Sequence, residues 1–486
     1  MTSIKPITVA HGDGIGPEIM TAVLEILKEA EVPIRIEAIE VGEKLYKRHY
    51  TSGIADDTWD IIERTKTILK APITTPQGGG YKSLNVTLRK KLGLYANIRP
   101  TIAYHPYVTT LHPKMDLVVV RENEEDIYAG IEYRQTKNMY SSLKLISEIG
   151  SEKIVRYAFE YAVKNNRKRV SCFSKDNIMK FSDGIFHKVF DRVAEEYPNI
   201  ESNHFIVDIG TAKLANHPEL FDVVVTSNLY GDIISDVASE ISGSVGMAGS
   251  ANIGEKYAMF EAVHGSAPDI AGKNMANPSG LLNAAIMMMI HLGEPKIASI
   301  VENAWKKTLE DGIHTSDIYH ENHSSKNVGT KEFADAVIKN LGAAPKTLPK
   351  AEYTLSASDT KQSKEYSLNM VSTESKVLVG VDVFFDMEEK SPKAIAETIH
   401  KATSGKLELK TIASKGLKLW PSNQDSEILS DHWCARFMPL KESEQIFHKD
   451  ITNLLEMLAN ADIDFIKIEN LYDFSGNRGY SLAQGE

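Results

Sequence analysis

The chain has 486 residues, 42% of them hydrophobic, a length that predicts more than one folding core. Its net charge of −11 argues against nucleic acid or an anionic membrane as a partner, because both attract basic surfaces. Two distant cysteines, Cys172 and Cys434, exclude a disulfide framework, and no signal segment or bilayer-spanning run is apparent, so we expect a cytoplasmic protein.

The first predicted strand, Ile7–Ala10, leads into a glycine-rich turn that reads Gly12-x-Gly14-x-Gly16-Pro17. A helix should follow, because Ile19, Val23, Ile26 and Leu27 recur on one face. The third glycine comes one residue too early for the Rossmann fingerprint, and Pro17 lacks the N–H that a pyrophosphate would need. We therefore expect a tight turn that meets some other part of a cofactor, not a standard Rossmann site.

Short apolar runs at 118–120, 170–173 and 223–225 indicate buried strands. Helical patterns lie between them, including 153–164 and 184–195. Alternation of strands and helices predicts an α/β body, which we place at residues 1–341.

The pattern changes near residue 342. Residues 342–375 lack sustained periodicity and read as a linker. Residues 376–486 predict a separate α+β domain with a ferredoxin-like βαββαβ order: strand 377–385, helix 392–402, strands 407–413 and 432–438, helix 443–460 and strand 464–470. His432 and Cys434 are expected to pack within a strand and not to bind metal.

Asp232 and Asp236 form the clearest candidate metal site. They stand four residues apart in Asn228-Leu-Tyr-Gly-Asp-Ile-Ile-Ser-Asp, so a helix would place both carboxylates on one face at the end of strand 223–225. Carboxylate oxygens suit Mg²⁺ or Mn²⁺. The alternative is that the two aspartates only complement the helix dipole.

Three segments together resemble the isocitrate and isopropylmalate dehydrogenase family. They are Gly-Asp-Gly-Ile-Gly-Pro near the start, Lys70-Ala-Pro-Ile-Thr-Thr-Pro-Gln-Gly-Gly-Gly-Tyr-Lys-Ser-Leu-Asn-Val-Thr-Leu-Arg89, and Val118-Val-Val-Arg-Glu-Asn-Glu-Glu-Asp-Ile-Tyr-Ala-Gly130. The resemblance covers residues 1 to about 340. It implies a two-subdomain body distinct from the Rossmann fold, with a large subdomain at about 1–94 and 244–341, a small one at about 95–243, and a dimer-forming clasp at about 126–147.

The C-terminal extension resembles that of a long bacterial subtype of isocitrate dehydrogenase. We favour a dimer-stabilising or assembly role for it, and a ligand-sensing role is the alternative. The resemblance implies a homodimer with shared active sites, and a higher oligomer stays open.

The substrate candidates are Arg89, Arg99 and Arg121, because planar guanidinium groups bind carboxylates in bidentate fashion. Ser83 and Asn85 look like the isocitrate branch of the family, since isopropylmalate enzymes carry an apolar residue near there. We therefore expect isocitrate as substrate, with homoisocitrate or isopropylmalate as alternatives.

The resemblance assigns the catalytic acid to Tyr128 and the base to Lys175, with Lys180 as a weaker candidate. It also implies that Asp208, from the partner subunit, is a third metal ligand beside Asp232 and Asp236. The reaction would be oxidation and decarboxylation of isocitrate to 2-oxoglutarate and CO₂. A non-catalytic regulatory subunit is the alternative from a different class, although such a subunit should have lost these residues.

The segment Glu261-Ala-Val-His-Gly-Ser-Ala-Pro-Asp-Ile270 resembles the family's adenosine-phosphate loop. Asp269 predicts NAD, because a carboxylate accepts the ribose 2′-OH and repels a 2′-phosphate. Ser316 and His320 stand where NADP enzymes place a tyrosine and an arginine, although Tyr319 or His320 could still reach the phosphate. NADP is therefore the alternative cofactor, and Asp269 would then only cap a turn. The complete set of expected cofactor contacts is Thr75, Asn177, Glu261, His264, Gly265, Asp269, Ile270, Asn277 and Asp317.

Overall fold

The computed structural model describes residues 4–48, 53–75, 83–354, 374–388, 391–422, 430–441 and 443–486. The chain forms two compact units: Met1–Ala129 with Lys144–Tyr366, and Gly130–Leu143 with Ser367–Glu486. Most of the predicted linker, residues 355–373, lies outside the described residues. The division at 341 and 376, and the two subdomains, remain predictions.

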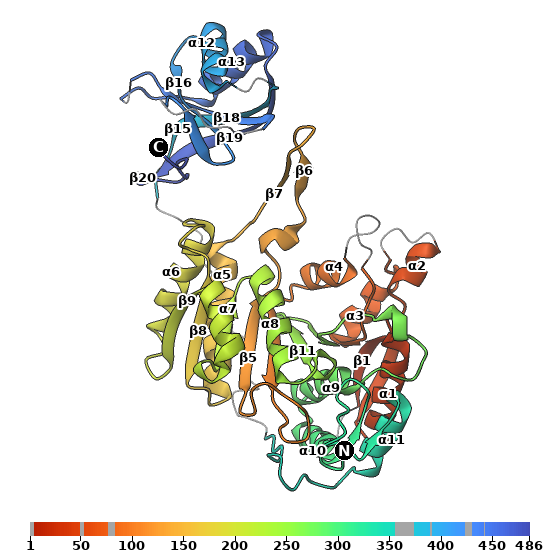
Figure 1. The fold of residues 1–486 in the computed structure, drawn as a ribbon. Helices are drawn as coiled ribbons and strands as arrows, with labels where there is room; N and C mark the ends of the chain where they lie inside the picture. Colours follow the sequence, from red (N-terminus) through yellow and green to blue (C-terminus); the bar gives the residue numbers. More distant parts are fainter. Residues whose placement is uncertain are drawn as a thin grey trace. The chain divides into compact units, whose positions relative to one another are not determined.

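The first unit is built on one large mixed sheet (Figure 1). Neighbours pair in parallel, except that β11 runs antiparallel to β12 and β4 runs antiparallel to both β11 and β5. In spatial order its strands, among the described residues, are β2 (Ile34–Ile39), β1 (Lys5–Ala10), β3 (Thr67–Lys70), β12 (Ala258–Ala262), β11 (Gly249–Ile253), β4 (Ala96–Ile102), β5 (Asp116–Glu122), β10 (Val223–Thr226), β8 (Arg169–Ser174) and β9 (Glu201–Ile206). The three predicted apolar runs are β5, β8 and β10, and the predicted α/β fold is confirmed.

Helices cover both faces of this sheet (Figure 1). They are α1 (Gly16–Glu29), α2 (Glu43–Lys47), α3 (Thr58–Thr65), α4 (Leu84–Lys91), α5 (Glu148–Lys164), α6 (Ser182–Ala194), α7 (Val207–Asn216), α8 (Asn228–Ser242), α9 (Ser279–His291), α10 (Pro295–Glu310) and α11 (Thr330–Lys339). The predicted helices 153–164 and 184–195 correspond to α5 and α6. The short strands β13 (Ile313–His314) and β14 (Lys326–Asn327) pair with each other.

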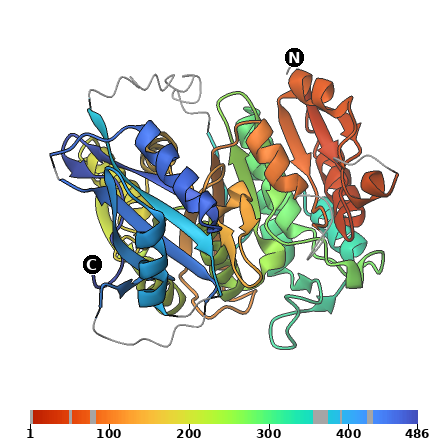
Figure 2. The same cartoon turned by 90° about the horizontal axis from the view of Figure 1, so that it is seen from above.

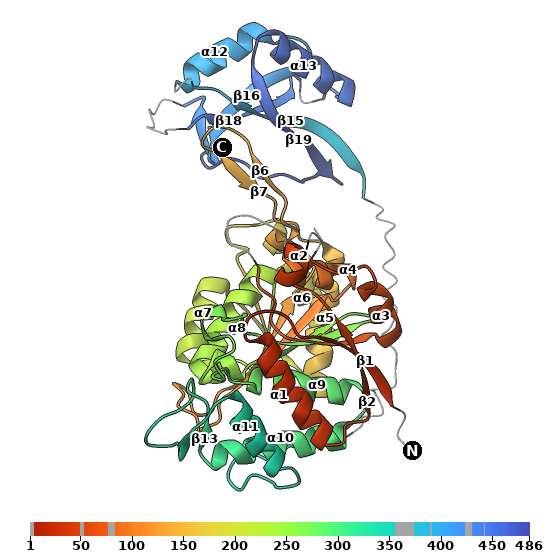
Figure 3. The same cartoon turned by 90° about the vertical axis from the view of Figure 1, so that its right-hand side faces the viewer.

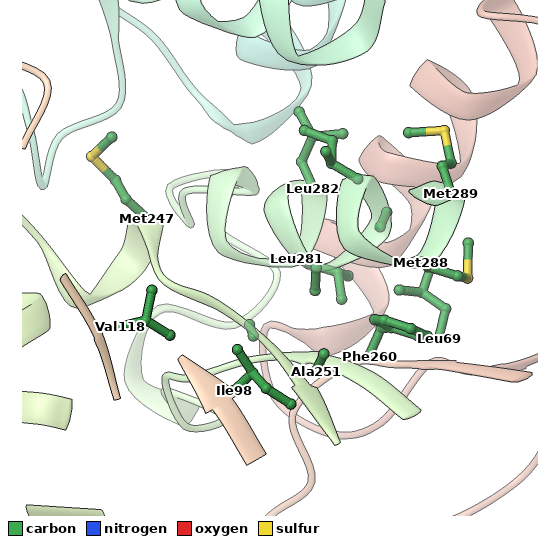
Figure 4. Close-up of a cluster of buried hydrophobic side chains, with 14 of the residues drawn as sticks. Leu69, Ile98, Val118, Met247, Ala251, Phe260, Leu281, Leu282, Met288 and Met289 are labelled. Carbon is green, nitrogen blue, oxygen red and sulfur yellow. The ribbon is translucent and has the colours of Figure 1, made fainter. Parts of the chain in front are cut away.

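Helix α9 supplies much of the core. Its Leu281, Leu282, Met288 and Met289 are fully buried; Leu281 and Met288 face Phe260 of β12, and Leu282 and Met289 point from the other side of the helix (Figure 4). Removing side chains of this size from water stabilises the fold by about 1.5–3 kcal/mol each. The central helix therefore anchors the strands that carry the site described below.

The second unit contains an antiparallel sheet with the order β17-β16-β18-β15-β19-β20. Both α12 (Pro392–Ala402) and α13 (His448–Asn460) lie on one face of it, as Figures 2 and 3 show. The strands are β15 (Lys376–Asp386), β16 (Leu407–Ser414), β17 (Leu417–Trp420), β18 (His432–Pro439), β19 (Asp464–Phe474) and β20 (Asn477–Arg478). The four long strands take the ferredoxin-like order that the sequence predicts. Helix α13 begins at His448 and not at 443, because the Phe447 N–H donates to Asp450 and fixes the first turn there.

A hairpin of β6 (Glu132–Arg134) and β7 (Tyr140–Ser142), inside the predicted clasp, belongs to this second unit. The side chains of Gln135 and His432 hydrogen-bond at 2.7 Å, and Asn138 donates to Asp431 at 3.1 Å. His432 therefore serves as a hydrogen-bonding residue of the sheet. Dimer formation through the clasp stays a prediction.

The helices can be compared with the length and hydrophobicity that a transmembrane helix needs. Every helix in the described part of the chain is too short or too polar to cross a lipid bilayer.

Candidate active site

Three buried arginines converge from different elements of the first unit. Arg99 lies on β4, Arg121 on the neighbouring strand β5, and Arg89 on α4. Their exposed fractions are 4%, 1% and 8%. The sheet register explains the first two, because Asn97 and Arg121 are cross-strand partners and Arg99 stands two residues beyond Asn97 on the same face.

Asp232 joins two of these arginines. Arg121 donates to Asp232 Oδ1, and Arg99 Nη2 lies 3.3 Å from the same oxygen. Burial opposes ionisation of Asp232, but the charges of Arg121 and Arg99 outweigh it and lower the pKa of this carboxyl. Burial beside Arg99 and Arg89 lowers the pKa of Arg121 to about 10, so the guanidinium stays charged at neutral pH.

The third arginine is held by a buried carboxylate. Arg89 Nη2 lies 2.9 Å from Glu261 Oε1, and Lys70 Nζ lies 2.6 Å from Glu261 Oε2. Burial alone would raise the pKa of Glu261, but Lys70 and Arg89 hold it well below its ordinary value. Glu261, expected as a cofactor contact, is thus engaged inside the protein by two cations.

Two polar residues at the start of α4 fit a ligand. Ser83 occupies the N-cap position, its side chain makes no capping hydrogen bond, and Thr75 Oγ1 donates to its hydroxyl at 3.4 Å. Asn85 Oδ1 and Arg89 Nε are buried and have no hydrogen-bond partner among the described residues. Because buried polar atoms are normally paired, these two call for a polar ligand.

Tyr128 lies at the same place, on the short helix η1 (Asp126–Ala129). Its hydroxyl donates to Asp232 Oδ2 at 2.7 Å, and the Arg121 guanidinium carbon lies 5.0 Å from the ring centroid. Burial raises the pKa of Tyr128 above its ordinary value. The phenol therefore keeps its proton at neutral pH and can act as an acid.

Helix α8 starts at Asn228, separated from the end of β10 by one residue. Asp232 and Asp236 still share one helix face, and Arg99 Nη1 lies 3.4 Å from Asp236 Oδ1. Their side chains are 37% and 63% exposed, so both remain open to a bound cation. Burial raises the pKa of Asp236.

Lys175 and Asp208 form a second cluster. Lys175, directly after β8, lies with its Nζ 2.5 Å from Oδ1 of Asp208 on α7. This bond lowers the pKa of Asp208. Asp208 does not join Asp232 and Asp236 within the chain: among the described residues, the only three potential ligands that converge are a different set, discussed below. Asn177 is exposed on the loop after Lys175.

The glycine-rich turn packs closely against two other loops, which contain Pro72 and Ser266. A Cβ at Gly14 would stand 1.9 Å from the Ser266 carbonyl oxygen, and a Cβ at Gly12 would stand 2.1 Å from that of Pro72. Both glycines have positive φ, which other residues rarely adopt. The turn therefore lies against the loop of residues 263–270 that is expected to meet the cofactor.

Several expected cofactor residues line that loop. His264 Nε2 is buried and has no hydrogen-bond partner in the described structure, and burial lowers the pKa of its ring. Gly265 and Asp269 are exposed, whereas Ile270 packs against the core. Asn277 Nδ2 donates to Asp317 at 3.0 Å, and Ser244 donates to the same oxygen of Asp317 at 2.7 Å.

Two important residues were not singled out from the sequence. Lys70 neutralises Glu261, its direct neighbour in the register of β3 and β12. Asn228 accepts hydrogen bonds from Arg121 Nε and Nη2 at 3.1 and 2.7 Å, which fixes the guanidinium plane. A lysine at the end of an otherwise apolar strand was the only sequence signal for the first.

Named relatives can be aligned with this chain over nearly its whole length. The isocitrate dehydrogenase [NADP] of Rickettsia felis is 66% identical over all of both chains. That of Thermus thermophilus is 41% identical and covers 99% of this chain and 96% of its own length. A crystal structure of the Thermus thermophilus TT0538 protein superposes with a TM-score of 0.93, at 40% identity over 99% of this chain and 96% of the other.

The prediction of NAD as cofactor is wrong, because the similar relatives from Rickettsia and Thermus are named for NADP. The physical reason lies in Asp269. It is exposed on the short helix η4 (Pro268–Ile270), and no hydrogen bond or ion pair from another described residue fixes it. An exposed, solvent-screened carboxylate can turn away from a phosphate, so the repulsion assumed from the sequence is not enforced.

Residues 6–337 match the isocitrate/isopropylmalate dehydrogenase family, and residues 376–486 match the C-terminal domain of bacterial isocitrate dehydrogenase. The chain therefore belongs to the isocitrate/isopropylmalate dehydrogenase family, in its long bacterial form with a C-terminal domain.

Proposed function

We propose that this protein oxidises and decarboxylates isocitrate to 2-oxoglutarate and CO₂, with NADP as hydride acceptor and a divalent metal ion as cofactor. The observation that carries the proposal is the convergence of buried Arg99 and Arg121 on Asp232, which also accepts from Tyr128. Arg89 completes the basic wall.

The charge of this pocket suits a tricarboxylate. Arg89, Arg99, Arg121 and Lys70 supply four positive charges, and Glu261, Asp232 and Asp236 supply three negative ones. A divalent cation would bring the excess to three positive charges, which equals the charge of fully ionised isocitrate. Ser83 and Asn85 add neutral hydrogen bonds, a polar environment that disfavours the isopropyl group of isopropylmalate.

The donor set fits Mg²⁺ or Mn²⁺, because the carboxylate oxygens of Asp232 and Asp236, on partly exposed side chains, are hard ligands on one face of α8. A divalent ion bound there would polarise the 2-hydroxyl and the adjacent carboxylate of the substrate. The arginines would orient the carboxylates so that C2 faces the nicotinamide. Arg121, held by Asn228, presents a fixed guanidinium plane for this purpose.

Two side chains would move protons. Lys175 would accept the proton of the 2-hydroxyl as the hydride leaves C2. After loss of CO₂, Tyr128 would deliver a proton to C3, a role that its raised pKa supports. Lys180, the weaker candidate for the base, is exposed.

We place the two halves of the site on different subunits. Lys175 is paired with Asp208, so the two residues would enter a site together. Since Asp208 does not converge with Asp232 and Asp236 inside one chain, a homodimer that brings the Lys175–Asp208 half of one subunit to the Asp232–Tyr128 half of the other would complete the ligand set.

Three observations support NADP binding at the loop of residues 263–270. The partnerless Nε2 of His264 offers a buried hydrogen-bonding atom, and Asp317 is held toward Asn277 by its hydrogen bonds. Tyr319 and His320 are exposed on the turn that follows Asp317 and can provide donors to a 2′-phosphate. These residues are consistent with the cofactor for which the relatives are named.

A substrate and cofactor panel tests the proposal. We expect Mg²⁺-dependent reduction of NADP with isocitrate, equal amounts of 2-oxoglutarate and NADPH, and much lower rates with 3-isopropylmalate or with NAD. Absence of any rate with isocitrate would contradict the reaction, and faster reduction of NAD than of NADP would contradict the cofactor.

A further inference from the structure

Two histidines and one aspartate converge next to the loop that carries Lys175. His187 comes from α6, His204 from the edge strand β9, and Asp176 from the loop between β8 and α6. Among the described residues they form the only group of three potential metal ligands whose ligating atoms all lie within 4.8 Å of one another. None of the three belongs to the substrate pocket or to the Asp232–Asp236 pair.

The ligand atoms of this cluster lie about as far apart as the ligands of one metal ion. Asp176 Oδ2 lies 2.7 Å from His187 Nδ1, and Asp176 Oδ1 lies 3.8 Å from His204 Nε2. The two imidazole rings stack with centroids 3.6 Å apart, so one ring would have to rotate for both to direct a nitrogen at the same ion. Ligands of one tetrahedral zinc ion, each about 2.0–2.2 Å from the metal, stand roughly 3.3 Å from one another, which falls inside this range.

Asp191 and Ser174 also contact the two imidazole rings. Asp191, one helical turn after His187, has Oδ2 3.6 Å from the other ring nitrogen, Nε2. This is an ion-pair distance and not a hydrogen bond; moved slightly closer, the carboxylate would orient the ring as carboxylates do behind metal-bound histidines. Ser174 Oγ lies 2.8 Å from His204 Nε2, the nitrogen that also faces Asp176, so an ion bound at this nitrogen would replace the hydrogen bond to Ser174.

We propose that Asp176, His187 and His204 bind a divalent transition-metal ion, of which Zn²⁺ is the representative, at a site separate from the Mg²⁺ or Mn²⁺ of the reaction. Two imidazoles and one carboxylate select Zn²⁺, Co²⁺ or Ni²⁺ over Mg²⁺, whereas the all-carboxylate pair on α8 has the opposite preference. The side chains are 17–25% exposed, so the ion can enter from solvent and keep a water ligand.

The site would fix the loop that carries Lys175. Asp176 is the next residue, and Asp183 on α6 accepts a hydrogen bond from the Lys175 backbone N–H at 2.6 Å. An ion shared by the loop, α6 and β9 would tie these elements together. Amide exchange of residues 175–181 should therefore slow when the ion binds.

Binding of Co²⁺ to the full-length chain tests the proposal, with Mg²⁺ in large excess to occupy the carboxylate pair. We expect one Co²⁺ per chain, with visible d–d absorption of histidine ligation, and at least about tenfold weaker binding in His187→Gln and His204→Gln. His112→Gln, another half-buried histidine, and Asp236→Asn should bind Co²⁺ as the unchanged protein does. Equal binding in all five proteins, or loss of binding in Asp236→Asn alone, would overturn the proposal.

A measurement on the unchanged protein covers the case in which a variant does not fold. Diethylpyrocarbonate modifies accessible histidines, and the modified peptides can be identified by mass spectrometry. Zn²⁺ in the presence of excess Mg²⁺ should protect His187 and His204 and leave His112 reactive. Equal modification of His187 and His204 with and without Zn²⁺ would contradict the site.

Discussion

Replacement of Glu261 by glutamine tests how the basic pocket is held together. Glu261 is 4% exposed and contacts Lys70 and Arg89, which are 1% and 8% exposed. Glu261→Gln keeps the shape of the side chain but leaves two buried cations without their counter-charge. Breaking a buried ion pair from one side costs about 3–5 kcal/mol. At roughly 2 °C per kcal/mol in a unit of this size, Tm should fall by about 6–10 °C.

The pH dependence of this effect has a definite sign. The folded pKa of Glu261 lies below its unfolded value, which is about 4.3. Its contribution is therefore fully present above that value and is lost as the pH falls through the folded pKa. The Tm difference between Glu261→Gln and the unchanged protein should be constant from about pH 5 to 8 and shrink in more acidic solution.

Differential scanning fluorimetry of matched variants measures the difference. Asp335→Asn is the control, because Asp335 forms an exposed pair with Lys331 on α11, and its Tm should change by less than about 1 °C. If Glu261→Gln shifts Tm no more than this control does, Glu261 does not neutralise the buried cations in the way argued here.

Three further outcomes are expected. Tyr128→Phe should lower kcat by about 10²- to 10⁴-fold with little change in the KM of isocitrate, whereas Tyr133→Phe on the exposed hairpin should leave both unchanged; steady-state kinetics distinguish them. Asp236→Asn should raise the Mg²⁺ concentration for half-maximal rate by at least about tenfold, and an unchanged Mg²⁺ dependence would remove Asp236 from the metal site. Asp382→Asn should destabilise the second unit by about 2–4 kcal/mol, because Arg436 loses two charged hydrogen bonds of 2.8 Å and keeps only Glu486 as a carboxylate partner; urea unfolding followed by tryptophan fluorescence, to which Trp433 contributes, reports it.

Hydrophobic periodicity was sufficient to predict the long secondary-structure elements named here. The runs at 118–120, 170–173 and 223–225 are strands because they are apolar on both faces, as strands inside a layered α/β sheet must be. The four long strands of the second unit were found in the same way. The short strands β17 and β20 were missed, since two to four residues carry no readable period.

The residues of the candidate site could be found as sequence motifs. Which of them contact one another could not be predicted. Lys70 and Glu261 lie 191 residues apart and meet only because β3 and β12 are in register. Lys175 and Asp208 likewise meet because β8 pairs with β9 and α7 follows. The cofactor was mispredicted for a related reason: sequence gives the charge of Asp269 but not its exposure.

The shared active site can be tested by combining two inactive variants. Lys175→Met removes the proposed base, and Asp236→Asn removes a proposed metal ligand from the other half of the site. In a mixed dimer, isolated through two affinity tags, one site would carry both substitutions and the other neither. The account predicts that the mixed dimer regains about half of the unaltered protein's NADP-dependent isocitrate oxidation. A mixed dimer as inactive as its two parents would contradict it.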